Sequence, residues 1–255
     1  MFNKLQMSII QEERCAEWLL LTEIGLLSKS EKGNRTVKTC KKLSDSFFTS
    51  GRLDAEYYQP KYDYLFSRLS EFATSTIGEL VEIRKSIEPG SDAYQDVGVP
   101  FVRVSDLSKF GLSKTNIHLN PEEYHNVIRP QKDTILLSKD GSVGIAYKVD
   151  EPLDIITSGA ILHLSLKSKA VLPDYLTLVL NSPIVSLQAE RDAGGSIIQH
   201  WKPSEIENVI IPILPMFMQQ EITKKIRLSF KLRVECQELL RKAKQMVEMA
   251  IENVI

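Results

Sequence analysis

The sequence predicts an α+β fold, in which a small twisted β-sheet or partial barrel packed with helices precedes one long C-terminal coiled-coil α-helix. Between residues 99 and 166, short β-branched and aromatic runs alternate with Gly, Pro and Asp turn signals. Residues 216–255 contain no Gly or Pro. Pro212 and Pro215 mark the boundary between the two parts, because proline lacks an amide donor and fixes its own φ.

The composition of the 255 residues is that of an ordinary globular protein, with 43% hydrophobic and 25% charged residues. No apolar run approaches the roughly 20 residues that a membrane span needs, and no secretory pattern precedes Gln11. We therefore expect a cytoplasmic protein with no membrane partner. Cys15, Cys40 and Cys236 lack CxxC spacing, which argues against a disulfide framework and a zinc site. The net charge of −1 lacks the basic excess of most nucleic-acid binders, so such a role requires a local basic face.

Residues 1–51 are expected to form a helix and a basic linker. Apolar residues through Leu27 are spaced for one helical face, and Gly25 lies close to the helix end. Residues 28–42 are polar, basic and nearly free of large apolar groups. This is typical of a solvated connector, although such a connector can also contact DNA phosphates.

Aromatic residues crowd the next segment, which leads into a helix expected at 61–72. They are Phe47, Phe48, Tyr57, Tyr58, Tyr62, Tyr64 and Phe66. Aromatic side chains each bury a large area, so the cluster is expected to anchor one element on another. A platform on which bases stack is the alternative.

A strand is expected at 99–104, after a short amphipathic segment at 77–85 and a loop at 87–98. Its alternation places Phe101, Arg103 and Ser105 on one face. Arg103 needs a partner, which is either an acid such as Asp106 or a guanine edge or phosphate. Further strands are expected at 116–119, 134–138, 145–149 and 160–166.

A tight turn at 138–144 joins two of these strands. Gly141 and Gly144 allow the backbone to approach a ligand closely, while Lys139 and Ser142 offer donors to a phosphate. An ordinary hairpin turn accounts for the same residues.

Helices expected at 173–181 and 183–191 lead to a Gly-Gly loop at 192–202. In this loop Gln199 offers the bidentate amide that pairs with adenine, and His200 and Lys202 have the reach for a phosphate or guanine. A loop that merely turns the chain would also use Gly-Gly.

Enzyme motifs are largely absent. Residues 181–184 (NSPI) depart from the methyltransferase tetrapeptide Asn-Pro-Pro-aromatic, because Ser182 and Ile184 replace the second-position proline and the aromatic. The four histidines are isolated, so no metal site is expected, and His163 is best explained as a partly buried imidazole with a satisfied partner. A nuclease site assembled from distant carboxylates leaves no local signature.

The C-terminal helix carries a coiled-coil seam, in which apolar residues recur in alternating steps of four and three. They are Cys236, Leu240, Ala243, Val247, Ala250 and Val254. About 40 residues at about 1.5 Å each make a rod of about 60 Å, far longer than one small domain covers. The stripe therefore needs another helix, and the N-terminal helix is too short to cover it.

Four segments resemble landmarks of the specificity subunits of type I restriction-modification systems, in that family's order. They are GRLDAEYYQPKY (51–62), VPFVRVSDL (99–107), DTILLSKDGSVG (133–144) and IPILPMFMQQEI (211–222), the last of which opens a basic-acidic helix. The resemblance runs roughly from residue 52 to residue 255. Such subunits usually carry two recognition domains, whereas this chain has room for one.

The resemblance implies a target-recognition domain at 52–214 and a partner-docking coiled-coil helix at 215–255. It implies a non-catalytic module that reads one half of a bipartite site in double-stranded DNA. The module docks modification (methyltransferase) subunits, and S-adenosylmethionine and ATP are expected only on partner subunits. The candidate DNA contacts are Arg84, Lys85, Arg103, Ser105, Lys139, Gly141, Ser142, Ser196, Gln199, His200 and Lys202.

One recognition domain per chain also predicts a homodimer through the C-terminal helix. The candidate dimer or partner contacts are Leu232, Cys236, Leu239, Leu240, Ala243, Met246, Val247, Ala250 and Val254. Two other functions remain as alternatives. One is a coiled-coil scaffold or interaction protein without DNA binding, and the other is a nuclease with a dispersed site.

Overall fold

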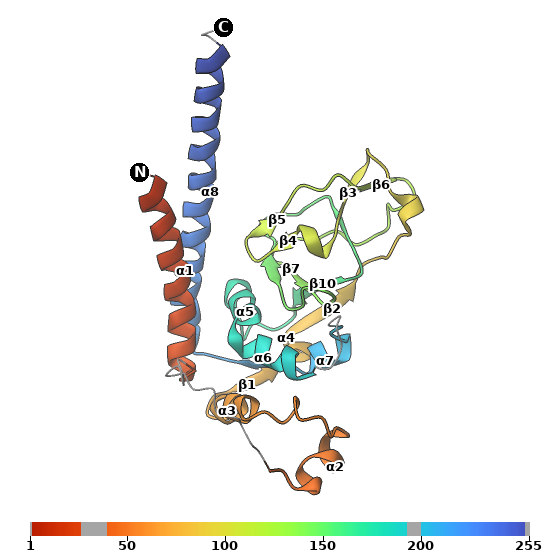
Figure 1. Cartoon of the computed structure of the whole chain (residues 1–255), viewed down its shortest axis with the longest axis vertical. Coiled ribbons are helices and arrows are strands. Elements are labelled where there is room, and N and C mark those ends of the chain that lie inside the picture. The colour runs from red at the N-terminus through yellow and green to blue at the C-terminus, as the bar shows by residue number, and fades with distance from the viewer. Residues whose placement is uncertain (1, 27–39, 193–199, 253–255) are drawn as a thin grey trace.

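Two long helices stand beside a body of short strands and helices (Figure 1). The structure is a computed structural model that describes residues 2–26, 40–192 and 200–252. The α-helices are α1 (Phe2–Ile24), α2 (Phe47–Ser50), α3 (Pro60–Leu69), α4 (Ile77–Leu80), α5 (Pro173–Leu180), α6 (Pro183–Asp192), α7 (Pro203–Glu207) and α8 (Met216–Glu252). Short 3-10 helices are η1 (Leu43–Asp45), η2 (Ser91–Ala93) and η3 (Val104–Asp106). None of the described helices is long and apolar enough to cross a membrane.

The strands form four small sheets rather than a closed barrel, as far as the chain is described. They are β1 (Thr74–Thr76), β2 (Val81–Lys85), β3 (Val99–Val102), β4 (Leu107–Ser108), β5 (Gly111–Leu112), β6 (His118–Leu119), β7 (Ile135–Ser138), β8 (Ala146–Lys148), β9 (Ile156–Thr157), β10 (Ile161–Leu166) and β11 (Ile210–Pro212). The predicted α+β class with a small sheet and a long C-terminal helix is confirmed. The term partial barrel describes the sheets only loosely.

The helices α1 and α8 run antiparallel and pack against each other, and we call this pair the stem (Figure 1). Ala16 and Leu20 of α1 are fully buried and belong to the same apolar cluster as Ile222 of α8. Gly25 ends α1 with a φ of +70°, and a Cβ there would lie 2.2 Å from Nη2 of Arg68. The left-handed backbone favours glycine here, whereas the Arg68 guanidinium is the end of a flexible side chain that could move away from a Cβ.

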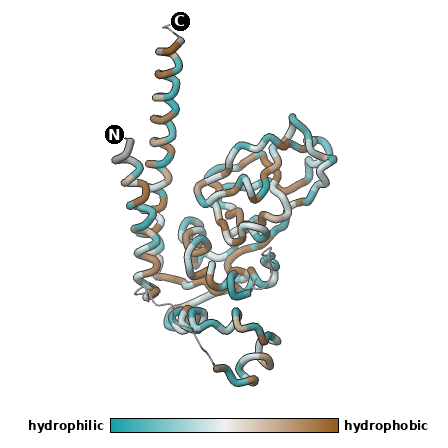
Figure 2. The backbone as a smooth tube through the Cα atoms, in the orientation of Figure 1, coloured by the Kyte–Doolittle hydropathy of each residue, from teal (hydrophilic) through white to brown (hydrophobic). Residues whose placement is uncertain are grey.

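Only the first part of α8 is paired with α1, because α8 continues well past the start of α1 (Figure 2). Cys236 is 8% exposed and Leu232 and Leu239 are half-buried, whereas Leu240 is 42% exposed. All residues from 241 to 249 are exposed, including the seam candidates Ala243, Met246 and Val247. Ala250 also lies on α8, and Val254 lies outside the described residues. What covers this part of the seam stays a prediction.

The main sheet has the order β2-β10-β7-β8, with antiparallel neighbours throughout. Leu137, Leu162 and Leu164 on one face join the apolar cluster of the helices, whereas Leu136 and Ile161 join a second cluster. Because both faces of the central strand β7 are covered, it reads as an apolar run without alternation, whereas the edge strand β2 alternates apolar and charged residues. A smaller sheet, β6-β3-β9, lies beyond the second cluster and has an apolar cluster of its own.

The short amphipathic segment at 77–85 divides into two elements, because Thr76 and Glu79 form a capping box that starts α4, and the chain turns extended at Val81 to form β2. One expectation for the body is wrong in detail. The strand expected at 99–104 ends at Val102. There the Asp106 carboxylate accepts the Arg103 amide proton at 2.9 Å and closes η3. Arg103 and Ser105 therefore do not project from a strand face.

A cavity of about 410 Å³ lies where the stem meets the body. On one side Asp174, which is 4% exposed, binds Lys148 at 3.1 Å and Arg227 of α8 at 2.8 Å. On the other side the β4–β5 hairpin reaches the stem, where Lys109 Nζ lies 2.6 Å from Glu13 Oε1. Two ionic connections therefore join the body to the stem, in addition to the apolar cluster that the two parts share.

Candidate nucleic-acid interface

The turn between β7 and β8 is closed by its own hydrogen bonds. Gly144 donates its amide proton to the Ser138 carbonyl at 2.9 Å, and the Ser138 hydroxyl accepts the Ile145 amide proton at 2.9 Å. Gly141 and Gly144 both have positive φ, at 72° and 86°. Gly141 and Ser142 are exposed at the tip. The turn therefore presents a preformed backbone at the surface.

Lys139 of this turn already has a partner. Its ammonium forms an ion pair with Asp140, and its side chain is only 13% exposed. The other Asp140 oxygen lies 2.8 Å from His200 Nδ1. Burial alone would raise the pKa of Asp140, but the hydrogen bonds from Lys139 and His200 lower it below its ordinary value.

Asp140 therefore ties the turn to the chain that follows the Gly-Gly loop. Asp140 and His200 also form a backbone bridge, and Trp201 donates its amide proton to the Lys139 carbonyl at 2.9 Å. Asp140 was absent from the candidates predicted from sequence. Its one local signal is an acid placed between a lysine and a glycine in a tight turn, and nothing in the sequence indicates the histidine from another segment that it binds.

Four candidates come from two further places, the strand β2 and the start of η3. Arg84 and Lys85 lie on the edge strand β2 and pair with Glu82 and Glu88, both at 2.9 Å. Arg103 is 47% exposed and lies 3.9 Å from Asp106, so the ion pair between them is weak. The nearby Ser105 donates to Asp106 at 3.4 Å.

Most of these segments meet around residues 158–160, which join β9 to β10. Lys139 donates its amide proton to the Ala160 carbonyl at 2.9 Å, and Ser158 donates to the Val102 carbonyl, next to Arg103, at 2.8 Å. A Cβ added at Gly159 would lie 2.7 Å from the Lys85 side chain. We call this region the reading edge. It brings Lys85, Arg103 and Lys139 to one end of the two sheets.

The remaining candidates lie at its border or outside the description. Lys202 is exposed, precedes α7 and pairs with Glu205 at 3.5 Å. Ser196 and Gln199 lie outside the described residues. No three His, Cys, Asp or Glu side chains of the described chain are placed to share a metal ion.

The buried histidine has the satisfied partner expected from the sequence. His163 Nε2 lies 2.8 Å from the Thr157 hydroxyl, and burial lowers the pKa of His163 to about 4. His163 is therefore a neutral core residue of β10, and we exclude it from the interface.

Comparison with solved structures supports the same fold. The chain is similar to the S subunit of a type I restriction-modification system from M. genitalium, with 12% identity and a TM-score of 0.52, covering 97% of this chain and 56% of that one. It is similar to a chain from a study of complex assembly and conformational transition of the type I R-M system, with 13% identity, a TM-score of 0.50, and coverage of 99% and 53%. The type IIG restriction endonuclease BpuSI gives 10% identity and a TM-score of 0.51, covering 68% of this chain and 28% of that one.

The chain spans about half the length of the two type I chains that it matches. At these identities the likeness concerns the fold alone. A search of curated proteins finds no match. A family model described as the type I restriction modification DNA specificity domain matches residues 69–235, which is more than half of the chain. This chain therefore belongs to the family of type I restriction-modification DNA specificity domains.

Proposed function

We propose that this chain reads one half of a bipartite site in double-stranded DNA for a type I restriction-modification system and performs no chemistry itself. The observation that carries the proposal is the reading edge, where Lys85, Arg103 and the turn of Lys139 converge from three segments of a specificity-domain fold. In protein–DNA complexes, contacts of this kind set register on phosphates and read base edges.

The charges of the reading edge predict how it binds. Lys85 and Lys139 are paired with acids within the chain, so a phosphate must replace those ion pairs. Their contribution to affinity is therefore smaller than that of free cations. Arg103 lies 3.9 Å from Asp106, so of the three cations it gives up the weakest ion pair when it binds DNA. It is the best placed of the three for bidentate recognition of guanine.

The test is a gel-shift series at two salt concentrations, on duplexes selected from random DNA by the wild-type chain. We expect Arg103→Ala to cost about 1–3 kcal/mol and to relax the preference at one position. Lys132→Ala, which removes an exposed ion pair with Glu151 in another part of the body, is the control. If Arg103→Ala bound DNA with the same affinity as Lys132→Ala and selected the same motif, Arg103 would not be part of the interface.

We further propose that the stem docks modification subunits and that two copies of the chain associate through it. The support is the uncovered part of α8, where Met246 and Val247 are 71% and 59% exposed. An apolar stripe along a helix normally packs against another element of the structure or a partner. A pair of chains would supply the second recognition domain that longer family members carry.

The chemistry would then reside on other chains. In this proposal the modification subunits bind S-adenosylmethionine and methylate adenine, other subunits use ATP, and the complex works in the cytoplasm where the DNA is. This chain would bring these activities to a chosen sequence.

A further inference from the structure

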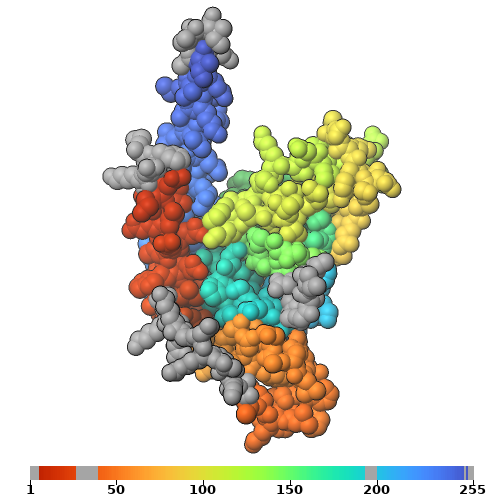
Figure 3. Space-filling model, in the orientation of Figure 1, coloured from red at the N-terminus to blue at the C-terminus, as the bar shows by residue number. Residues whose placement is uncertain are grey.

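His200 lies at the surface of the body, next to the turn that joins β7 and β8. Its side chain is 65% exposed. Residues 200–207, light blue in Figure 3, lie beside the green region of the main sheet, on the side of the body away from the stem. Nδ1 of His200 lies 2.8 Å from Asp140, whereas Nε2 forms no hydrogen bond with any described residue. Nε2 is therefore available to a partner from outside the chain.

The backbone around His200 is fixed by the turn and by the core. Asp140 and His200 form a backbone bridge, and Trp201 donates its amide proton to the Lys139 carbonyl at 2.9 Å. The Trp201 side chain is 1% exposed and belongs to the apolar cluster of the helices. An exposed imidazole on a fixed backbone is pre-organised for recognition of a single group on a ligand.

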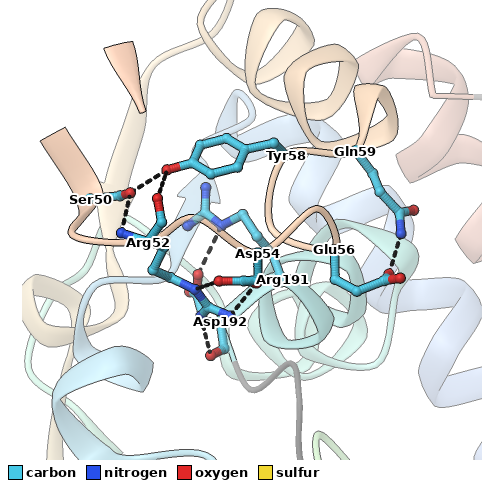
Figure 4. A network of polar contacts seen from close by, with 8 residues as sticks. All are labelled: Ser50, Arg52, Asp54, Glu56, Tyr58, Gln59, Arg191 and Asp192. Carbon is cyan, nitrogen blue, oxygen red and sulfur yellow. Dashed lines mark hydrogen bonds and ion pairs between the residues drawn. The ribbon is translucent and has the colours of Figure 1, made fainter. Parts of the chain in front are cut away.

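The chain is also anchored before residues 193–199, which lie outside the described residues. Arg52 donates to the Asp192 carbonyl at 3.2 Å (Figure 4). The Arg52 guanidinium is itself held by a bidentate pair with Asp54, at 2.8 and 2.7 Å. The chain therefore leaves α6 at a fixed place and reaches the main sheet again at another, His200.

Asp140 determines which ring nitrogen of His200 carries the hydrogen. Burial alone would raise the pKa of Asp140, but the hydrogen bonds from Lys139 and His200 keep it below its ordinary value, so the carboxylate is ionised at neutral pH. An ionised carboxylate accepts hydrogen bonds and cannot donate them. Nδ1 of His200 is therefore the donor, and in a neutral imidazole this leaves Nε2 as an acceptor.

An acceptor at Nε2 selects among the groups that double-stranded DNA presents. Phosphate oxygens and the O6 and N7 atoms of guanine are acceptors, so they form no hydrogen bond with a second acceptor. In the major groove, where all four base pairs can be distinguished, the donors are the amino groups at N6 of adenine and N4 of cytosine. This reverses the expectation from residue type alone, which is that His200 contacts a phosphate or guanine.

We propose that His200 reads the exocyclic amino group of an adenine or a cytosine in the major groove, and that Asp140 is the positioning residue that fixes the imidazole for this contact. The inference rests on the proposed function, because it requires that the chain contact base edges. Lys139 then acts through Asp140, whose charge and position it maintains, rather than through a phosphate.

The first test uses gel shifts at about pH 8, where histidine is neutral, on the duplex that the wild-type chain selects from random DNA. We expect His200→Ala to bind about two- to tenfold more weakly, the effect of losing one hydrogen bond, and to relax the preference at one position that carries adenine or cytosine. The matched control is His125→Ala, which removes another exposed histidine, whose Nδ1 lies 2.6 Å from the Glu122 carbonyl.

Base analogues without the amino group test the same contact from the DNA side. Purine replaces adenine, or 2-pyrimidinone replaces cytosine, at the position that depends on His200. We expect the analogue to weaken binding of the wild type and of His125→Ala about two- to tenfold more than binding of His200→Ala.

The second test separates the role of Asp140 from a merely structural one. In Asp140→Asn, Lys139 holds the amide oxygen, so the amide nitrogen donates to Nδ1 of His200. The ring hydrogen then moves to Nε2, which becomes a donor. Guanine or thymine, whose major-groove edges offer acceptors, should therefore be favoured at the same position. A loss of stability alone would weaken binding to all sequences and leave the preferred base unchanged, and binding is measured well below the melting temperature of the variant.

The outcomes separate this inference from the proposed function. An identical motif for His200→Ala and the wild type would overturn the inference and leave the proposed function intact. A wild-type preference for guanine or thymine at the position that depends on His200 would show that Nε2 is a donor, and this also overturns it. An unchanged preference for Asp140→Asn would overturn the role of Asp140. A wild-type chain that selects no motif would overturn the proposed function as well.

Discussion

The guanidinium carbon of Arg233 on α8 lies 3.7 Å from the ring centroid of Phe110, between β4 and β5. Arg233 is also 3.6 Å from Glu13 of α1, the residue that binds Lys109. One hairpin of the body thus contacts both helices of the stem. This contact, together with the pair of Asp174 and Arg227, determines the direction in which the reading edge faces relative to the stem.

A double-mutant cycle of Phe110→Ala and Arg233→Ala measures this contact. We expect a coupling free energy of about 0.5–1 kcal/mol in urea unfolding, as for other partly exposed cation–π pairs. The exposed pair of Lys132 and Glu151 gives the matched control, whose coupling should be near zero. Additive effects of the two changes at the hairpin would show that the ring and the guanidinium do not stabilise each other.

Asp140→Asn should destabilise the protein at neutral pH but not in acid. The pKa of Asp140 is lowered in the folded state, so the ionised carboxylate stabilises the fold above its unfolded pKa of about 3.9. That stability is lost as the pH falls through the lowered folded pKa. Melting temperatures of wild type and variant should therefore differ at pH 6 and converge below pH of about 4. Ser142→Ala in the same turn is the control, and its difference from the wild type should not depend on pH in this way.

His163 should make the protein sensitive to mild acid. Burial lowers the pKa of His163 to about 4, so below its unfolded pKa of about 6.5 the unfolded chain binds a proton that the folded chain does not bind. The free energy of unfolding therefore decreases as the pH falls from about 6.5 to 4, by at most about 3 kcal/mol. His163→Gln keeps a hydrogen-bonding partner for Thr157 and should flatten the dependence of the free energy of unfolding on pH in that window. An equal slope for the variant would assign the acid sensitivity to other groups.

Val247→Glu should change assembly without changing the fold. The side chain is 59% exposed, so a carboxylate there stays hydrated in the isolated chain. In an association of two copies the same carboxylate would be buried in the helix contact, which costs several kcal/mol. Light scattering should show a dimer for the wild type and a monomer for the variant. Gln245→Glu, on the same helical turn, adds the same charge without removing an apolar contact and should stay dimeric.

The parts of the fold that the sequence predicts well are those with long repeating patterns. The stretch without Gly or Pro became α8, and Pro173 and Pro183 begin α5 and α6 as helix N-termini favour. Strands of two or three residues, such as β4, β5, β9 and β11, are too short to carry a detectable alternation. They form because the neighbouring chain supplies hydrogen bonds, which a local pattern does not record.

The sequence indicates the residue types of the candidate site, but it indicates less well which partners those residues contact. The turn at 138–144 forms the predicted connection between two strands. The contact of Asp140 with His200 joins residues 60 positions apart, so no local spacing indicates it. For Arg103 the strand alternation failed, because Asp106 competes for its amide and ends the strand. Phe48 belongs to the aromatic cluster that was expected to anchor one element on another, but it is 73% exposed, because apolar character alone does not tell a core residue from a surface residue.

The largest apolar cluster of the protein does not stop at Pro215. It runs from Leu65, Tyr175 and Trp201 of the body into Leu20 of α1 and Ile222 of α8. Stem base and body should therefore melt as one cooperative unit, and residues 52–214 expressed alone would expose the surface that α1 and α8 cover. An engineer who exchanges recognition domains between family members should move α1 and the first turns of α8 together with the body. A graft cut at Pro215 would keep the DNA preference of the transferred domain. Its uncovered apolar surface would make the chain aggregate.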